Sequence, residues 1–196
     1  MQHSPSSEKP HKHRVCPWWF GYLLLGPIRR LRHDPSAILG PYVREGMTVL
    51  EPGPGMGFFT LELARRVGPT GRVIAVDVQP KMIGRLKRRA ANANLAESID
   101  ARVTRAESMQ LDPLDSVDFV LAFAVVHEMP DAAAFFAEAA ASMKPGARML
   151  LAEPSGQVND VEFDTEIEMA KRAGLEAEAR PPILRARTAL LRKIQA

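Results

Sequence analysis

The sequence predicts an α/β protein built on a doubly wound, mostly parallel β-sheet. Short β-branched runs alternate with stretches of helical periodicity along most of the chain, and this alternation is typical of βαβ units. Near-continuous apolar runs, such as VIAV at 73–76, indicate strands that are buried on both faces. Sheets of this kind bind ligands at the carboxyl ends of their strands, so candidate site residues are expected there.

The composition is that of an ordinary globular protein. The 196 residues are 46% hydrophobic and 25% charged, which is enough for one large core. The net charge of +3 gives no strong positive field, so no nucleic-acid partner is expected. Cys16 is the only cysteine, which excludes an internal disulfide and fits the reducing cytoplasm. One cysteine and five histidines lack the paired spacing of zinc ligands, so no metal site is predicted.

The amino-terminal region differs from the rest of the chain. Residues 1–14 are polar and rich in Pro and Ser, and we predict a disordered tail. The apolar run 15–28 is interrupted by Pro and Gly, and it is shorter than the roughly 20 residues that span a bilayer. We therefore predict a helical lid segment over 15–45, followed by a ligand-binding domain over 46–196. The aromatic residues of the lid segment could cover a ligand, pack as core, or place 15–32 at a membrane surface.

The first strand and the helix after it are predicted from periodicity. The run 47–51 reads as a buried strand. A helix over 57–67 follows, because Phe59, Leu63 and Val67 share one helical face. The same rules predict further strands within 72–77, 99–108, 117–131 and 147–154, and further helices over 34–43, 79–94, 131–143 and 159–174.

The carboxyl-terminal third carries clear boundary signals. Asn159 and Glu162 form an Asn-x-x-Glu capping pattern at the start of the last helix. Residues 175–193 then read as two strands around Pro181-Pro182, which predicts an antiparallel hairpin at the end of the sheet. The predicted sheet therefore has seven strands.

A glycine-rich turn follows the first strand. Gly53, Gly55 and Gly57 give the pattern G-x-G-x-G, whereas the nicotinamide fingerprint places its third glycine one residue later. Glu51 precedes the turn, and a carboxylate at a strand end would repel a pyrophosphate. It would instead favour a cationic group such as an amino-acid ammonium, while glycine permits close approach of the backbone.

Two more carboxylates follow the next two strands. Asp77 ends the strand 72–77, where an acid can accept hydrogen bonds from both ribose hydroxyls. Glu107 closes the region of the third strand and could accept from an exocyclic amino group such as that of adenine. Contacts to an ammonium, a ribose and an adenine together describe S-adenosylmethionine.

With these residues the chain resembles the class I S-adenosylmethionine-dependent methyltransferases, and within them the small-molecule group that includes ubiquinone and menaquinone biosynthesis enzymes. The resemblance covers about residues 34–193. The stretches that carry it are VLEPGPGMGFFTLELA, VIAVDVQPKMI, AESMQLDPLDSVDFVLAFAVVHEMPD and SMKPGARMLLAEP. Two departures are the prolines at 52 and 54 and the use of Glu rather than Asp at 51.

The resemblance implies a Rossmann-like fold, S-adenosylmethionine as cofactor and S-adenosylhomocysteine as product. Glu51 would meet the methionine ammonium, and Asp77 the ribose hydroxyls. The other cofactor contacts that it implies are the three glycines on the methionyl and ribose side, Val78, Met82, Glu107 and Ser108 around the adenine, and Ala122 and Phe123 near the methionyl end.

His127 follows the fourth strand, beside the expected sulfonium. One interpretation is a general base that deprotonates a hydroxyl or thiol, since the ordinary pKa of histidine, about 6.5, suits that work. The other is a polar strand-end residue that shapes the pocket. Glu128 could orient the imidazole or face solvent.

The acceptor is expected to be a small molecule, because little chain remains to form a separate substrate domain. Arsenite is disfavoured because the enzymes that methylate it use several cysteines. Three alternatives stay open: a nicotinamide-dependent oxidoreductase, a cofactor-binding module without catalysis, and an RNA methyltransferase. The sequence does not indicate which oligomeric state the protein adopts.

Overall fold

The computed structural model describes residues 33–111 and 116–194. The predicted tail 1–14 and most of the predicted lid segment, residues 15–32, lie outside the described residues. The same holds for the aromatic residues of that segment, for its possible membrane contact and for Cys16. None of the helices within the described ranges combines the length and apolar character that crossing a bilayer requires.

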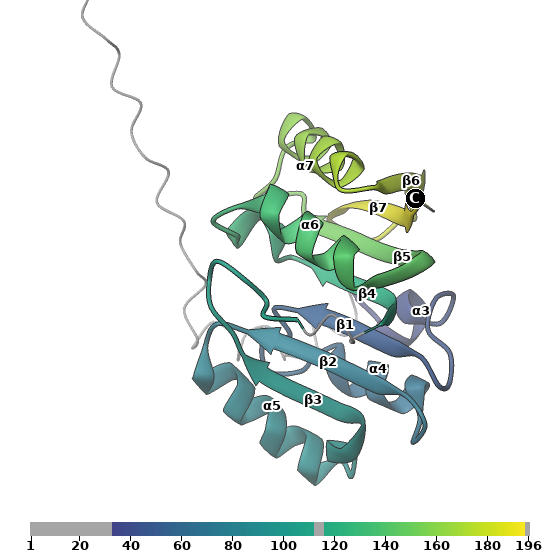
Figure 1. Cartoon of the computed structure of the whole chain (residues 1–196). Helices are drawn as coiled ribbons and strands as arrows, with labels where there is room; N and C mark the ends of the chain where they lie inside the picture. The colour runs from purple at the N-terminus through teal and green to yellow at the C-terminus, as the bar shows by residue number, and fades with distance from the viewer. Residues whose placement is uncertain (1–32, 112–115, 195–196) are drawn as a thin grey trace, which may run out of the picture.

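Seven strands form one sheet in the order β3-β2-β1-β4-β5-β7-β6, as Figure 1 shows. The pairs among β1 to β5 are parallel, whereas β7 runs antiparallel to both β5 and β6. The strands are β1 (Thr48–Pro52), β2 (Arg72–Asp77), β3 (Ile99–Val103), β4 (Val117–Phe123), β5 (Met143–Pro154), β6 (Leu175–Ala179) and β7 (Ala186–Lys193). The predicted doubly wound, seven-stranded sheet with a carboxyl-terminal antiparallel hairpin is confirmed.

Helices cover both faces of the sheet. Alternation along each strand sorts the core: Val49 and Leu121 face the side of α3 and α4, while Leu50 and Ala122 face the side of α6 and α7. Helix α5 packs on β2 through Ala75, on the side of α4. The helices are α3 (Pro35–Leu39), α4 (Thr60–Val67), α5 (Pro80–Asn92), α6 (Ala132–Ser142) and α7 (Asp160–Arg172), with 3₁₀ turns η1 (Ala96–Ser98) and η2 (Val126–Glu128).

Several predicted boundaries agree with the structure, and others differ. The helix predicted over 34–43 ends at Leu39. The capping box of Asn159 and Glu162 at the start of α7 is present in both directions. Helix α4 begins at Thr60 rather than at 57, because Gly57 has a φ of 83° and cannot continue a right-handed helix. Strand β5 begins earlier than predicted, since Met143 already pairs with Val117.

The described part of the predicted lid segment packs on the core. Leu39 is fully buried and Val43 is 3% exposed on the side of α4. The ring of Tyr42 stacks on Phe119 of β4, with 5.7 Å between the ring centroids and 6° between their planes. Leu39, Tyr42 and Val43 therefore belong to the core, while His33 reaches the rim of the cavity described next.

Candidate functional site

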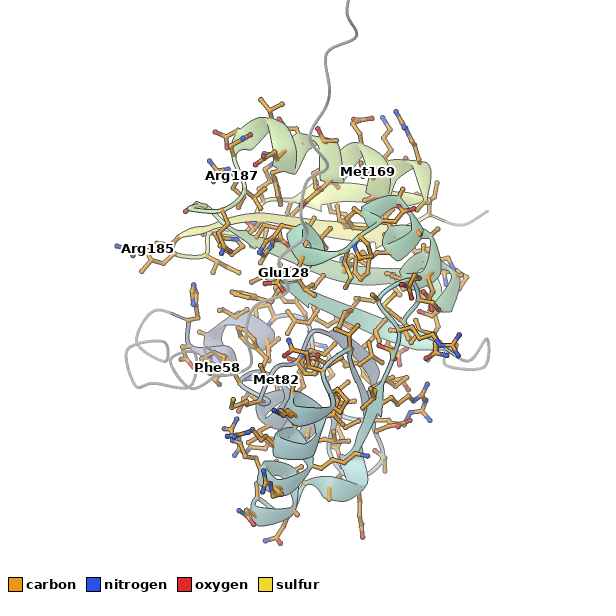
Figure 2. All side chains as sticks on the ribbon, turned by 90° about the vertical axis from the view of Figure 1, so that its left-hand side faces the viewer. Phe58, Met82, Glu128, Met169, Arg185 and Arg187 are labelled. Atoms are coloured by element: carbon orange, nitrogen blue, oxygen red, sulfur yellow. The ribbon has the colours of Figure 1, made fainter. Side chains whose placement is uncertain are left out.

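A cavity of about 840 Å³ lies at the carboxyl ends of the parallel strands. The strand order reverses between β1 and β4, and such a switch point is where open α/β sheets bind ligands. Figure 2 views this edge of the sheet, with Glu128 near the middle, Met82 and Phe58 below it and Arg185 at one side. The volume falls within the range of ligand pockets, about 300–1,000 Å³.

The three glycines of the first turn have different structural roles. All have positive φ angles: 63° at Gly53, 55° at Gly55 and 83° at Gly57. A Cβ atom on Gly53 would come within 2.6 Å of Val125, and one on Gly57 within 2.5 Å of Leu86. A Cβ on Gly55 would meet no heavy atom within 4 Å. Gly55 therefore presents bare backbone to the cavity, whereas the other two also permit close packing.

Glu51 and Asp77 stand at the ends of adjacent strands, and both line the cavity. Glu51 is 4% exposed and Asp77 is 9% exposed. Burial raises the pKa of Asp77 to about 6, although the amides of Gln79 and Gly55 donate to its carboxylate and lower the pKa. Gln79 N lies 2.8 Å from Asp77 Oδ1. Asp77 is thus held by the backbone at the edge of the cavity.

The wall beyond β2 and β3 comes from a helix and a loop. Val78, which follows β2, and the buried Met82, in the first turn of α5, both line the cavity. Strand β3 ends at Val103, so Glu107 and Ser108 lie in the loop after the strand rather than at its tip. Glu107 is exposed, and Ser108 donates its hydroxyl to Glu138 of α6 at 3.1 Å.

The sequence-predicted residues are brought together with two exceptions. Glu51, Gly53, Gly55, Asp77, Val78, Met82, Glu107, Ser108, Phe123 and His127 all line the cavity. Gly57 lies outside the lining and packs against Leu86. Ala122 is fully buried in the core on the side of α6, one residue before Phe123, which does line the cavity.

His127 lies in η2, and its closest carboxylate is Glu153 at the end of β5. His127 Nδ1 contacts Glu153 Oε2, whereas Glu128 Oε1 lies 3.9 Å from Nε2. Burial lowers the pKa of His127, but the hydrogen bond and charge of Glu153, with the charges of Glu128 and Glu166, outweigh it and raise the pKa overall. The main partner of the imidazole is therefore Glu153 and not the adjacent Glu128.

Sequence reasoning missed Glu153 and His33. Glu153 satisfies the rule that found the other acids, because it stands near the end of a strand, in the run LLAEP. His33 precedes every motif and carries no local signal. Its Nε2 lies 2.9 Å from the carbonyl oxygen of Leu184, and its ring packs edge-on against Phe123 with 5.3 Å between the centroids.

The residues present fit S-adenosylmethionine. Gly55 leaves room at the backbone, Asp77 offers a buried acceptor at a strand end, and Val78 and Met82 give an apolar wall. Across the residues that the structure describes, no group of three or more His, Cys, Asp or Glu is arranged to hold a metal ion.

Two of the relatives that the chain matches are methyltransferases of known name. An arsenite methyltransferase of Halobacterium salinarum is 32% identical over 124 residues, which cover 63% of this chain and 30% of that protein. A ubiquinone biosynthesis O-methyltransferase of Bradyrhizobium diazoefficiens is 32% identical over 149 residues, which cover 75% of this chain and 54% of that protein. This chain thus spans about half, or less, of the length of these relatives.

The solved structures agree on the fold. The crystal structure of an S-adenosylmethionine-dependent methyltransferase from Aquifex aeolicus superposes with a TM-score of 0.80 at 23% identity, covering 92% of this chain and all of that one. A family model described as a methyltransferase domain matches residues 43–183, which is most of the chain. The chain therefore belongs to the methyltransferase domain family, and it shares the fold of the S-adenosylmethionine-dependent enzyme from Aquifex aeolicus.

Proposed function

We propose that this protein methylates a hydroxyl oxygen of a small, largely apolar acceptor, with S-adenosylmethionine as donor and His127 as general base. The observation that carries the proposal is that one cavity is lined both by the glycine turn with Asp77 and by His127. A cofactor bound at the first group and an acceptor beside the second would share that cavity. Such alignment supplies much of the rate of a displacement reaction.

The cofactor contacts follow the strand ends. We assign Glu51 to the ammonium, Gly53 and Gly55 to the methionyl side, and Asp77 to the ribose hydroxyls. Val78, Met82 and Glu107 would hold the adenine, and Phe123 would lie near the methionyl end. When bound, the cofactor supplies a methyl group activated by its sulfonium and leaves as S-adenosylhomocysteine. We do not assign Ser108 to the adenine, because its hydroxyl already donates to Glu138.

The chain's own contribution is to orient the acceptor and to hold a proton. A hydroxyl is a poor nucleophile until its proton leaves, and a base placed beside it typically contributes about 10²–10⁴-fold in rate. His127 Nε2 would take that proton, since Nδ1 is engaged by Glu153. Phe58, Phe59 and Phe123 line the cavity and would exclude water from the reacting atoms.

Two observations favour an oxygen acceptor over arsenite. The relative that matches three quarters of this chain is named an O-methyltransferase. Arsenic(III) is a soft centre that prefers thiolate ligands, and this chain has a single cysteine. A phenol also suits the aromatic lining of the cavity.

An RNA acceptor is disfavoured by the pairing of the basic residues. Arg89 of α5 donates to the carbonyl of Met56 in the glycine turn. At the carboxyl-terminal end, three arginines are engaged in ion pairs: Arg180 with Asp164, Arg187 with Asp160 and Arg192 with Glu178. These acids partly neutralise the basic residues at this end of the chain, and the net charge of +3 adds no strong positive field for a nucleic acid.

The proposal is tested on the full chain in two steps. Titration calorimetry should detect binding of S-adenosylmethionine and S-adenosylhomocysteine. A screen of simple phenols, catechols, thiols and amines should then yield S-adenosylhomocysteine, measured by mass spectrometry, with a phenol or catechol. Binding without turnover of any acceptor would favour a non-catalytic module, and turnover of thiols or amines alone would refute the oxygen acceptor.

Two histidine variants assign the base. His127→Ala should lower kcat with the phenol while the Kd for S-adenosylmethionine stays nearly unchanged. His33→Ala is the matched comparison, because His33 lines the same cavity but uses Nε2 for Leu184. A larger loss of kcat in His33→Ala than in His127→Ala would transfer the role of base to His33.

A further inference from the structure

We infer that Glu153 is a positioning residue, which fixes the tautomer and the direction of His127 so that Nε2 faces the acceptor as a base. The inference rests on the proposed function for its catalytic meaning. Its structural content, the tautomer of His127, can be measured without any acceptor.

The fold brings the two residues together through strand register. Phe123 of β4 pairs with Ala152 of β5, so the chain after β4 leaves the sheet directly beside Glu153. Ala124 then adopts a positive φ of 55° while its amide donates to the carbonyl of Ala152 at 2.7 Å. This left-handed conformation is energetically unfavourable for an alanine. It turns the chain from the end of β4 into η2, next to Glu153.

The two oxygens of Glu153 have separate partners. Oε1 accepts from the amides of Val125 and Val126 at 3.2 and 2.8 Å, and Oε2 contacts Nδ1 of His127. The side chain of Glu153 is fully buried. A carboxylate oxygen can only accept, so the hydrogen of a neutral imidazole must sit on Nδ1. The lone pair is then left on Nε2, which is what a base requires.

The other ring nitrogen has no comparable partner from Glu128. The separation of 3.9 Å between Nε2 and Glu128 Oε1 is too long for a hydrogen bond. The imidazole is 18% exposed and lines the cavity. His127 thus combines a buried, hydrogen-bonded nitrogen with one that remains available to a ligand in the cavity.

A third acid stands behind the pair. Glu166 of α7 is 8% exposed, and its Oε2 has no hydrogen-bond partner among the described residues. Burial and the charge of Glu153 raise the pKa of Glu166 to about 8, although His127 lowers it. The groups that face His127 are therefore Glu153 from β5, Glu128 from η2 and Glu166 from α7. Of these three acids, Glu153 is the one in hydrogen-bond contact with the ring.

Glu153 could instead serve only to hold the turn, by accepting from the amides of Val125 and Val126. The variant Glu153→Gln separates the two roles. Its amide oxygen can still accept from both backbone amides, so the turn is retained. Its NH₂ group would then point at Nδ1 and donate, which forces the imidazole hydrogen onto Nε2. If Glu153 only holds the turn, Glu153→Gln should keep its activity. If Glu153 positions His127, the variant should lose activity, because Nε2 of His127 no longer offers a lone pair to the acceptor.

Nitrogen-15 NMR of the full-length protein, with the signals of His127 assigned by comparison with His127→Ala, reads the tautomer directly. We expect the Nδ1–H form in the wild type, the Nε2–H form in Glu153→Gln, and a lower pKa of His127 in that variant. Glu128→Gln is the matched control and should keep the Nδ1–H form. An Nε2–H form in the wild type would overturn the inference even if Glu153→Gln failed to fold.

Turnover of a phenol provides the second readout. We expect kcat of Glu153→Gln to fall by about 100-fold or more, with the Kd for S-adenosylmethionine within about twofold of the wild type. Parallel losses of kcat, affinity and thermal stability, without a change of tautomer, would mean a structural clamp and overturn the inference. Failure of the wild type to methylate any acceptor, with the expected tautomers, would refute the proposed function and leave the positioning of His127 by Glu153 supported.

Discussion

The hydroxyl of Ser108 donates to Glu138 Oε1 at 3.1 Å, which ties the loop after β3 to helix α6. The same carboxylate accepts from the amide of Met109 at 2.9 Å and from that of Leu111 at 3.3 Å. Three donors of one loop thus converge on a single side chain of α6, which also lines the cavity. The position of Glu107, which we assign to the adenine, depends on this anchor.

Replacing Glu138 by Gln should therefore weaken cofactor binding without touching the cofactor's proposed contacts. The amide NH₂ of Gln would face a loop donor and leave it unpaired, and each lost hydrogen bond costs about 1 kcal/mol. We expect the Kd for S-adenosylmethionine to rise about fivefold to tenfold by calorimetry. Ser108→Ala removes one of the three bonds and should have a smaller effect. Equal affinities in all three proteins would show that the loop is held by other means.

Cofactor affinity should depend on pH through Asp77. The ribose hydroxyls need an ionised acceptor, and the pKa of Asp77 is raised to about 6. Because the bound form favours the carboxylate, protonation competes with binding as the pH falls. We expect a constant Kd for S-adenosylmethionine above about pH 7 and a rise that approaches tenfold per pH unit well below pH 6.

Asp77→Asn is the control for that titration. The variant keeps the shape of the side chain but cannot ionise, so its affinity should be flat between pH 5 and 8 and lower than that of the wild type above about pH 7. A pH dependence that persists in Asp77→Asn would assign the titration to another group.

Gly55 offers a test of close approach by the cofactor. Gly55→Ala adds a methyl group where no protein atom lies within 4 Å, at a φ of 55°. Gly46→Ala is matched in backbone strain, with a φ of 81° and Thr70 Oγ1 as its nearest neighbour at 3.7 Å, but Gly46 does not line the cavity. Both should lose about 1–2 kcal/mol of stability. Only Gly55→Ala should also lose affinity for S-adenosylmethionine, as calorimetry will show.

Glu166 should make the protein less stable at alkaline pH. Its pKa is about 8 in the folded protein and 4.5 as a free side chain, so folding favours the protonated form. Its contribution to the free energy of unfolding is complete below pH 4.5 and is lost as the pH rises through 8. Glu166→Gln should therefore have a higher Tm than the wild type at pH 9, by about 2–4 °C for each kcal/mol, and a similar Tm at pH 5.

The exposed Glu168 of the same helix provides the comparison for that measurement. Glu168→Gln should leave the pH dependence of the Tm unchanged. A similar shift in both variants would point to the net charge of α7 rather than to the buried carboxyl group.

Sequence periodicity predicted the sheet because strands buried on both faces leave an unmistakable apolar pattern. It also predicted the acids at the ends of β1 and β2, which occupy fixed places relative to their own strands. The pair of His127 and Glu153 could not be predicted in the same way, because it depends on which strands become neighbours. Nothing near His127 in the chain indicates that β5 will lie beside β4, so the adjacent Glu128 was the natural candidate for its partner.

The contact between His33 and Leu184 fixes where the chain enters the fold. The described chain begins at the rim of the cavity, not at the far edge of the sheet. His33 itself is consequently anchored next to the place where reactants would come and go. All seven strands follow His33 in the chain, so comparing the kinetics of a variant that begins at His33 with those of the full chain measures what residues 1–32 contribute.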